Sequence, residues 1–284
     1  MSQKRLLTFQ DYSCLGRCSI TVALPTISAF GVECVAVPTA ILSNHTAGFK
    51  SWTYLDLKND LKDIIHKWNG YKHHFDAIYT GYLGTEQVPI IKDIIDELKD
   101  DKTIVLVDPA FADFGKMYKG FNEEHIKEMK KLIAKAHIIV PNLTEACFLS
   151  DVHYDENMSD EKLEDMMKKL ALLGPKEVII SGLHQKDNLV TSIIYDSVSD
   201  KFSRYSSILY EGIYHGTGDL FASTFIGAKL DGFSTLEATK IAHDYVAKAI
   251  AYTLEDGKPD VCYGVEFERA IPDLIKMINE DRKR

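Results

Sequence analysis

The sequence lacks the long apolar runs that mark a membrane protein. No window among its 284 residues approaches the roughly 18 consecutive apolar residues of a membrane helix. Its first residues run into a strand-like segment with neither the apolar region nor the cleavage site of a secretion signal, so we expect a cytoplasmic protein. The five cysteines are an odd, scattered set, unlike the dense even framework of small secreted domains, which predicts reduced thiols.

Positive charge is also scarce. The 33 Lys and Arg against 42 Asp and Glu give a net charge of −9, which argues against nucleic acid as a partner, because phosphate-backbone binding depends on clustered cations. The basic cluster Lys127, Lys130, Lys131 and Lys135 lies among glutamates and predicts a solvated helix face with i,i+4 ion pairs. The chain has no Pro-, Gly- or Ser-rich linker and no repeat of fixed period, so we expect one domain over residues 1–284.

What the chain does have is an alternation of short β-branched runs and longer amphipathic stretches. The strand candidates are residues 5–9, 32–37, 77–80, 103–107, 137–140 and 177–181. Helical patterns lie between most of them, at residues 19–30, 54–68, 87–98, 123–135 and 160–173. Because parallel neighbours need a long return path, this order predicts an α/β fold with a doubly wound, mainly parallel sheet and helices on both faces.

The pattern changes in the last third of the chain. Residues 190–196 and 202–209 are separated by a loop short enough for a hairpin, which predicts an antiparallel edge on the sheet. Helical patterns then cover residues 219–229, 235–254 and about 267–278.

Open α/β sheets bind ligands at the carboxyl ends of their strands, so chemistry is expected just after each strand. Those positions are polar in this sequence: Gln10, Asp11, residues 43–46, Gly81, Tyr82, Asp108, Asp113, Asn142, Glu145, Ser181 and residues 215–219. His45 and His215 are the two histidines that border such motifs.

The run Gly216, Thr217, Gly218, Asp219 places two glycines immediately before an amphipathic helix. The first backbone amides of a helix have no internal acceptor, so a glycine turn at that point forms a phosphate-sized cradle. Asp219 has two interpretations: its carboxylate caps free amides of the helix, or it takes the proton of an alcohol during phosphoryl transfer. Neither the Gly-x-x-x-x-Gly-Lys-Ser/Thr loop nor a strand followed by Gly-x-Gly-x-x-Gly occurs, which argues against a Walker NTPase and a Rossmann dehydrogenase.

Over nearly its whole length the chain resembles the pyridoxal kinases of the ribokinase-like fold. The resemblance rests on Gln10, Ser43-Asn44-His45-Thr46, Thr80-Gly81-Tyr82-Leu83-Gly84, Val107-Asp108-Pro109, Pro141-Asn142-Leu143-Thr144-Glu145 and Gly216-Thr217-Gly218-Asp219-Leu220-Phe221. The last motif is shared by many sugar and nucleoside kinases, whereas Ser-Asn-His-Thr followed by Thr-Gly-Tyr is narrower and indicates B6 vitamers.

The resemblance implies ATP-dependent phosphorylation of the 5′-hydroxymethyl group of pyridoxal, pyridoxine or pyridoxamine in vitamin B6 salvage. It implies Asp219 as general base and the amides of Gly216, Thr217 and Gly218 as an anion hole. Substrate would be bound by Asp11, His45, Thr46 and Tyr82. ATP would be bound by Asp108, Asn142, Glu145 and Ser181, with Asp108 and Glu145 as Mg²⁺ ligands. Family members also lead us to expect a homodimer and a possible role for a monovalent cation.

One residue departs from the family pattern. Many members carry serine after the glutamine, where this chain has Asp11, and the spacing from Gln10 to Gly31 needs no gap. We hypothesise that a carboxylate at that position pairs with the pyridinium nitrogen or a substrate amine and so biases the enzyme among vitamers, toward pyridoxamine. The alternative is a helix or turn cap that points into solvent.

Three other functions compete. Hydroxymethylpyrimidine kinase shares the fold, but that family typically has cysteine in place of Asp219 and a glycine-rich segment near the first strand that is missing from this chain. A sugar or nucleoside kinase is disfavoured because no Gly-Gly motif occurs between residues 30 and 50. A non-catalytic vitamer or nucleotide carrier of the same fold is disfavoured by the intact Asp219.

Overall fold

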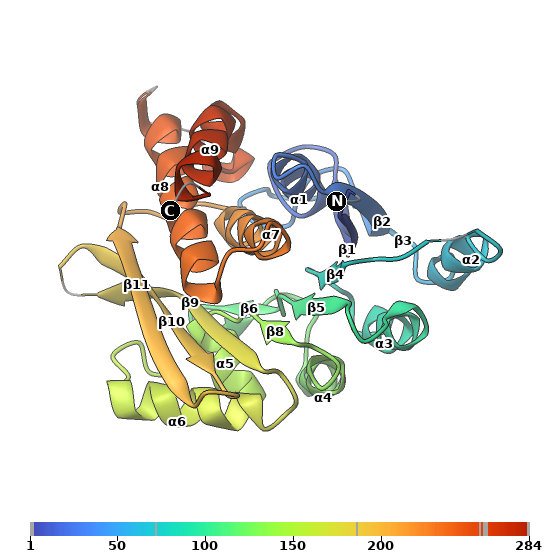
Figure 1. The fold of residues 1–284 in the computed structure, drawn as a ribbon, viewed down its shortest axis with the longest axis horizontal. Coiled ribbons are helices and arrows are strands. Elements are labelled where there is room, and N and C mark those ends of the chain that lie inside the picture. The colour runs from blue at the N-terminus through green and yellow to red at the C-terminus, as the bar shows by residue number, and fades with distance from the viewer. Residues whose placement is uncertain (1–2, 72, 186, 256, 258–260, 283–284) are drawn as a thin grey trace.

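The computed structural model describes residues 3–71, 73–185, 187–255, 257 and 261–282. Within that part of the chain, nine strands form one sheet in the order β11-β10-β9-β8-β5-β4-β1-β2-β3 (Figure 1). The strands are β1 (Arg5–Ser13), β2 (Glu33–Leu42), β3 (Tyr54–Asp56), β4 (Ala77–Thr80), β5 (Ile104–Val107), β8 (Ile138–Ile139), β9 (Glu177–Gln185), β10 (Leu189–Asp196) and β11 (Lys201–Ile208). A separate small ribbon pairs β6 (Ala112–Asp113) with β7 (Lys116–Met117).

The centre of the sheet is parallel and both of its edges are antiparallel. β2, β1, β4, β5, β8 and β9 run parallel to their neighbours in that order. β10 runs antiparallel to β9 and β11, and β3 runs antiparallel to β2. The predicted fold class, a mainly parallel sheet with an antiparallel edge, is confirmed.

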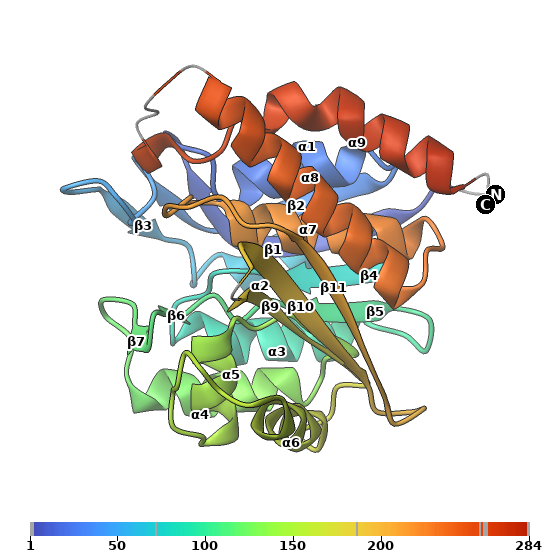
Figure 2. The same cartoon turned by 90° about the vertical axis from the view of Figure 1, so that its left-hand side faces the viewer.

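Helices cover both faces of the sheet, and each face has its own apolar core (Figures 1 and 2). Leu6 of β1 packs in the core under α1 (Ile20–Ser28), α7 (Thr217–Leu230), α8 (Thr235–Glu255) and α9 (Phe267–Asp281). Leu7, the next residue, packs in the opposite core with α2 (Leu61–His66), α3 (Gln87–Leu98), α4 (Glu123–Ile133), α5 (Leu143–Ser150) and α6 (Asp160–Ala171). Successive strand side chains point to opposite faces, which is why adjacent residues enter different cores.

One predicted element is wrong. Residues 54–68 were expected to form one helix, but Tyr54–Asp56 is strand β3 and the helix α2 begins only at Leu61. The cause is tertiary: β3 pairs with the end of β2, with Leu42 opposite Tyr54 and Ala40 opposite Asp56, and this pairing outweighs the local helical pattern.

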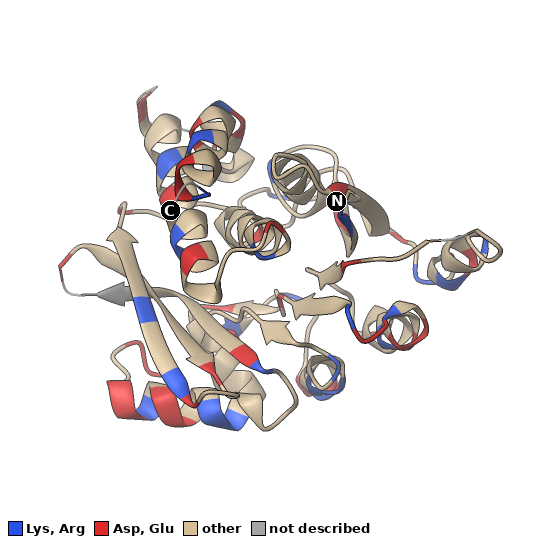
Figure 3. Cartoon of the chain, viewed as in Figure 1, with Lys and Arg blue, Asp and Glu red and all other residues tan. Residues whose placement is uncertain are grey.

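The charged residues lie in mixed rows along the helices, as Figure 3 shows for α4 and α6. On α4, Lys127 lies 3.7 Å from Glu124 and Lys131 lies 2.6 Å from Glu128, so these two lysines form local ion pairs, but at i,i+3 and not at the predicted i,i+4. Lys130 and Lys135 pair instead with acids of other segments, Asp151 at 2.7 Å and Asp96 at 2.8 Å. In the described part of the chain, no helix combines the length and apolar character that a membrane crossing requires.

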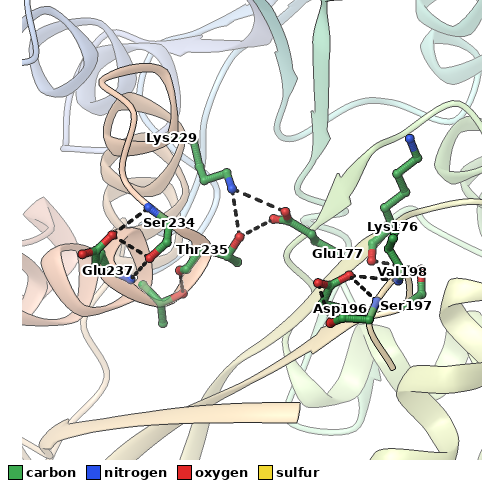
Figure 4. Close-up of polar contacts among 11 residues, drawn as sticks. Lys176, Glu177, Asp196, Ser197, Val198, Lys229, Ser234, Thr235 and Glu237 are labelled. Atoms are coloured by element: carbon green, nitrogen blue, oxygen red, sulfur yellow. Dashed lines mark hydrogen bonds and ion pairs between the residues drawn. The ribbon is translucent and has the colours of Figure 1, made fainter. Parts of the chain in front are cut away.

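Glu177, the first residue of β9, bonds to the end of α7 and to the start of α8 (Figure 4). Lys229, at the end of α7, lies 3.4 Å from a carboxylate oxygen of Glu177 and donates to the Thr235 hydroxyl at 2.8 Å. Thr235 in turn donates to Glu177 at 2.8 Å. This network fixes the C-terminal end of α7 on β9, and therefore the direction in which the N-terminus of α7 points.

Candidate active site

The N-terminus of α7 is open to a ligand. Gly216, its N-cap residue, has φ 78°, and a Cβ there would lie 2.2 Å from the carbonyl oxygen of Arg17, so only glycine fits. Glycine also has no side chain to cap the helix, and no side-chain cap is present. The first amides, which have no intrahelical acceptor, are thus left for an anion.

Asp219 lies in the first turn of α7, but its carboxylate does not cap that helix. Its Oδ2 accepts the backbone N–H of Ser19 at 2.9 Å and the thiol of Cys18 at 3.1 Å, both from the segment before α1. The capping interpretation of Asp219 is therefore wrong, because the carboxylate bridges to the N-terminus of a neighbouring helix. α1 and α7 lie side by side (Figures 1 and 2).

The environment of Asp219 suits a general base. Asp219 is half-buried. Burial raises the pKa of Asp219, while the Ser19 and Cys18 donors oppose that rise and the nearby Asp11 charge adds to it. A carboxylate with a raised pKa takes a proton from an alcohol more readily than an ordinary one.

Asp11 is buried at the end of β1, with 5% of its surface exposed. Its Oδ1 accepts the hydroxyl of Ser19 at 2.5 Å and its Oδ2 accepts the hydroxyl of Ser13 at 2.9 Å. Burial raises the pKa of this carboxyl. The alternative of a cap that points into solvent is therefore wrong.

The Ser-Asn-His-Thr loop follows β2 and packs on the 262–264 segment. His45 is 3% exposed, and its Nε2 donates to the carbonyl oxygen of Cys262 at 2.6 Å. Its ring centroid lies 5.0 Å from that of Phe49 and 5.5 Å from that of His215. Burial lowers the pKa of His45, whereas the charge of Asp219 raises it.

The next residue, Thr46, is exposed. Tyr82, which follows β4, is half-buried with its ring 5.5 Å from that of Phe121. Burial raises the pKa of Tyr82, and the charges of Tyr54 and Asp11 act in the same direction.

Asp108 and Glu145 are the buried carboxylates on the other side of the site. Burial and the charges of Glu145 and Asp219 raise the pKa of Asp108 well above its usual range. Glu145 is 2% exposed and accepts backbone N–H groups of Phe111 at 2.9 Å and Asn142 at 3.0 Å. The electrostatic repulsion among these acids fits a site that binds a hard cation through oxygen.

Asn142 and Ser181 are neighbours, joined by an isolated parallel bridge beyond β8 and β9. Asn142 is the N-cap of α5: its Oδ1 accepts the Glu145 N–H at 3.0 Å, and its Nδ2 donates to the Ala112 carbonyl at 2.7 Å. Asp113, the residue after Ala112, accepts the Phe114 N–H at 2.9 Å.

The structure thus brings most of the expected residues to the carboxyl ends of the central strands. No cluster of three or more Asp, Glu, His or Cys side chains able to chelate a metal exists among the described residues, so phosphate oxygens and water would have to complete a Mg²⁺ site. Arg17 is tied to Glu268 of α9 at 2.8 Å. Sequence reasoning missed the roles of Cys18 and Ser19, because nothing in their local pattern indicates a contact with a residue 200 positions away.

The mainly parallel sheet, with a glycine turn and an acid at the start of α7, fits the ribokinase-like class of small-molecule kinases that the sequence motifs resemble. The family model described as phosphomethylpyrimidine kinase matches residues 15–262. A Bacteroides thetaiotaomicron VPI-5482 protein assigned as a phosphomethylpyrimidine kinase and crystallised with pyridoxal is 33% identical, with a TM-score of 0.92 and 96% of each chain covered.

Two curated relatives are also similar. Pyridoxal kinase PdxY of Actinobacillus pleuropneumoniae serotype 5b (strain L20) is 28% identical, with 89% of this chain and 91% of that protein covered. The chloroplastic thiamine biosynthetic bifunctional enzyme TH1 of Arabidopsis thaliana is 27% identical over 82% of this chain, which spans only 44% of that longer protein. The chain belongs to the phosphomethylpyrimidine kinase family and is a kinase, which confirms the resemblance inferred from its motifs.

Proposed function

We propose that this enzyme transfers the γ-phosphoryl group of ATP to the 5′-hydroxymethyl group of a B6 vitamer, with pyridoxal as the reference substrate. The observation that carries the proposal is the half-buried carboxylate of Asp219 beside the uncapped N-terminus of α7. The similarity to a protein crystallised with pyridoxal supports this substrate class.

Asp219 would take the hydroxyl proton as the oxygen attacks phosphorus. The amides of Gly216, Thr217 and Gly218 would hold the oxygens of the transferring phosphoryl group, where negative charge develops. Both groups belong to one turn, so the base and the anion site keep a fixed relation to each other.

Asp108 and Glu145 would hold Mg²⁺, which when bound offsets the charge of the ATP phosphates. Glu145 already accepts three backbone N–H groups on its two oxygens, so Asp108 is the less constrained ligand. Asn142 and Ser181, neighbours at the ends of β8 and β9, would bind the nucleotide.

On the acceptor side, His45, Thr46 and Tyr82 would line the pyridine pocket. Asp11 lies in the same region, but both of its oxygens already accept serine hydroxyls. To contact a substrate cation directly, Asp11 would have to use a further lone pair on an oxygen that already accepts a hydroxyl. The predicted vitamer preference depends on that contact.

The second candidate is hydroxymethylpyrimidine kinase activity, which the family description favours. Its acceptor is also a hydroxymethyl group on a nitrogen heterocycle. Asp219 in place of the cysteine typical of that family argues for the B6 vitamers. A single catalytic domain over residues 1–284, a homodimer, a cytoplasmic location and activation by a monovalent cation stay predictions.

The test is release of ADP with a panel of alcohols: pyridoxal, pyridoxine, pyridoxamine, hydroxymethylpyrimidine, ribose and a nucleoside. We expect the three vitamers to give the highest kcat/KM and a 5′-phosphate product by ³¹P NMR. Faster turnover of hydroxymethylpyrimidine would favour the second candidate. Binding of pyridoxal without ADP release would instead indicate a carrier.

A further inference from the structure

Ser19 has a backbone conformation that serine rarely adopts. Its φ of 52° and ψ of −126° lie near the first central position of a type II′ turn, which glycine dominates. Such a conformation costs a non-glycine residue on the order of 1–3 kcal/mol and persists only where its surroundings enforce it. Ser19 is also 2% exposed, so the surroundings are protein, not water.

The contacts of Ser19 show what enforces this conformation. Its hydroxyl donates to Asp11 at 2.5 Å, and its N–H donates to Asp219 at 2.9 Å. Its carbonyl oxygen accepts the N–H groups of Val22 and Ala23, at 3.0 and 2.9 Å, and so begins α1. The side chain, the amide and the carbonyl of Ser19 are all engaged, and the first two bond to carboxylates of the candidate site.

We propose that Asp11 and Ser19 form a positioning pair for Asp219: the bond from the Ser19 hydroxyl to Asp11 holds the strained backbone that aims the Ser19 N–H at the Asp219 carboxylate. The proposal rests on the proposed function in taking Asp219 as the general base. Asp11 then acts through Ser19 and is a positioning residue, whatever the vitamer.

The geometry explains why a carboxylate suits position 11. A hydrogen bond to a charged acceptor is stronger than one between neutral groups, and a serine at position 11 could offer only the weaker kind. Each carboxylate oxygen of Asp11 accepts one serine hydroxyl, from Ser19 or from Ser13. In Asp219, both donors found in the described residues lie on Oδ2, and the proposal assigns Oδ1 to the alcohol.

The N–H of Ser19 also acts on the charge state of Asp219. It favours the ionised form and opposes the burial that raises the pKa of this carboxyl. Other titratable groups also interact with Asp219. Two lie on strands, Asp11 on β1 and Tyr79 on β4. Four lie in loops: Cys18 after β1, His45 after β2, Asp108 after β5 and Tyr118 after β7. The Ser19 hydroxyl also bonds to Asp11 and acts on Cys18, but Ser19→Ala and Ser19→Gly both remove it. A difference in the pKa of Asp219 between these two variants therefore reports the displaced N–H donor.

The decisive experiment compares Ser19→Ala with Ser19→Gly. Both remove the hydroxyl, but glycine adopts the observed φ and ψ without strain and keeps its N–H on Asp219, whereas alanine relaxes away. We expect Ser19→Ala to lose about tenfold or more in kcat and Ser19→Gly to stay within about threefold of wild type. The KM values for pyridoxal and ATP should change little in either variant. Equal losses in the two variants, or wild-type kcat in Ser19→Ala, would overturn the proposal.

The pH dependence separates positioning from a general loss of structure. In Ser19→Ala the acidic limb of the kcat profile should move to higher pH, because the ionised base has lost a donor. Ser13→Ala is the matched control: it removes the other hydroxyl from Asp11 without touching a donor to Asp219 and should leave that limb in place. Asp11→Ala should lower kcat in wild type more than in Ser19→Gly, where the pair is no longer needed.

One readout does not depend on the substrate. The carboxyl ¹³C resonance of Asp219, assigned by its loss in Asp219→Asn, should titrate at higher pH in Ser19→Ala than in wild type or Ser19→Gly. If no vitamer is phosphorylated, the proposed function fails while this titration still tests the positioning pair. An unchanged titration in folded Ser19→Ala would overturn the pair even in an active kinase.

Discussion

The helices α5 and α7 both carry an acid at their third position, at the same edge of the sheet, and they use it in opposite ways. In α5, Glu145 folds back on its own N-cap, Asn142, in a capping box and is 2% exposed. In α7 the N-cap is Gly216, no side chain caps the helix, and Asp219 reaches across to α1 while it stays half-buried.

The difference shows how similar local sequences produce structure in one place and a reaction site in another. Where the N-cap side chain and the acid satisfy the first amides and each other, the helix start is closed. Where the N-cap is glycine, the amides and one side of the acid remain open to a ligand. Asn142 and Gly216 therefore decide the use of the acid that follows each of them.

Asp219→Asn removes the proposed base at the uncapped N-terminus of α7 and should lower the activity most. The amide cannot take a proton, so we expect kcat to fall between about 10²- and 10⁴-fold. Titration calorimetry should show pyridoxal still binding, because the change is nearly isosteric. A loss in kcat of less than about tenfold would be hard to reconcile with Asp219 as the base.

Asp108→Asn tests the cation site between the two helix starts. With one proposed Mg²⁺ ligand weakened, the Mg²⁺ concentration for half-maximal activity should rise by about tenfold or more. Asp101→Asn is the matched control, an exposed acid before β5, whereas Asp108 follows that strand. Equal Mg²⁺ requirements for wild type and Asp108→Asn would remove Asp108 from the site.

Much of the fold could be predicted from the sequence because its signals are local. β4 and α3 have the bounds that the apolar patterns predict, residues 77–80 and 87–98. α5 was missed because it is buried on most sides and so lacks an amphipathic period. The helix expected from residue 54 failed because β3 depends on a pairing with β2 that local pattern does not encode.

The site divides in the same way. The glycine turn and Asp219 lie within four residues, and a single motif predicts them. The links from Cys18 and Ser19 to Asp219 join segments far apart in the chain, and no spacing rule contains them. The positive φ of Ser19 could not be predicted from the sequence either, because a turn of this type favours glycine and the sequence has serine there.

Gly216→Ala and Gly218→Ala sharpen the comparison at the N-cap of α7. At Gly216 an alanine meets the Arg17 carbonyl and a positive φ, which should destabilise the fold by about 2 kcal/mol. At Gly218 nothing lies within 4 Å of the added Cβ, so the thermal midpoint should hold or rise slightly. Thermal unfolding of the two variants measures the difference, and equal midpoints would show that the turn tolerates a side chain.

Glu145→Gln probes the closed terminus through pH, with the smallest expected effect. Burial raises the pKa of Glu145 to about 7, above its ordinary value near 4.3. The folded protein therefore binds more protons than the unfolded chain between those values. The stability that the protonated form of Glu145 contributes is fully present below its ordinary pKa and is lost as pH rises toward 7.

Glutamine cannot titrate, so the fall in thermal midpoint between pH 5 and pH 8 should be shallower in Glu145→Gln than in wild type. Equal slopes of thermal midpoint against pH in the two proteins would mean that the three backbone donors keep Glu145 ionised in the fold. The carboxylate would then be charged and ready to bind a cation.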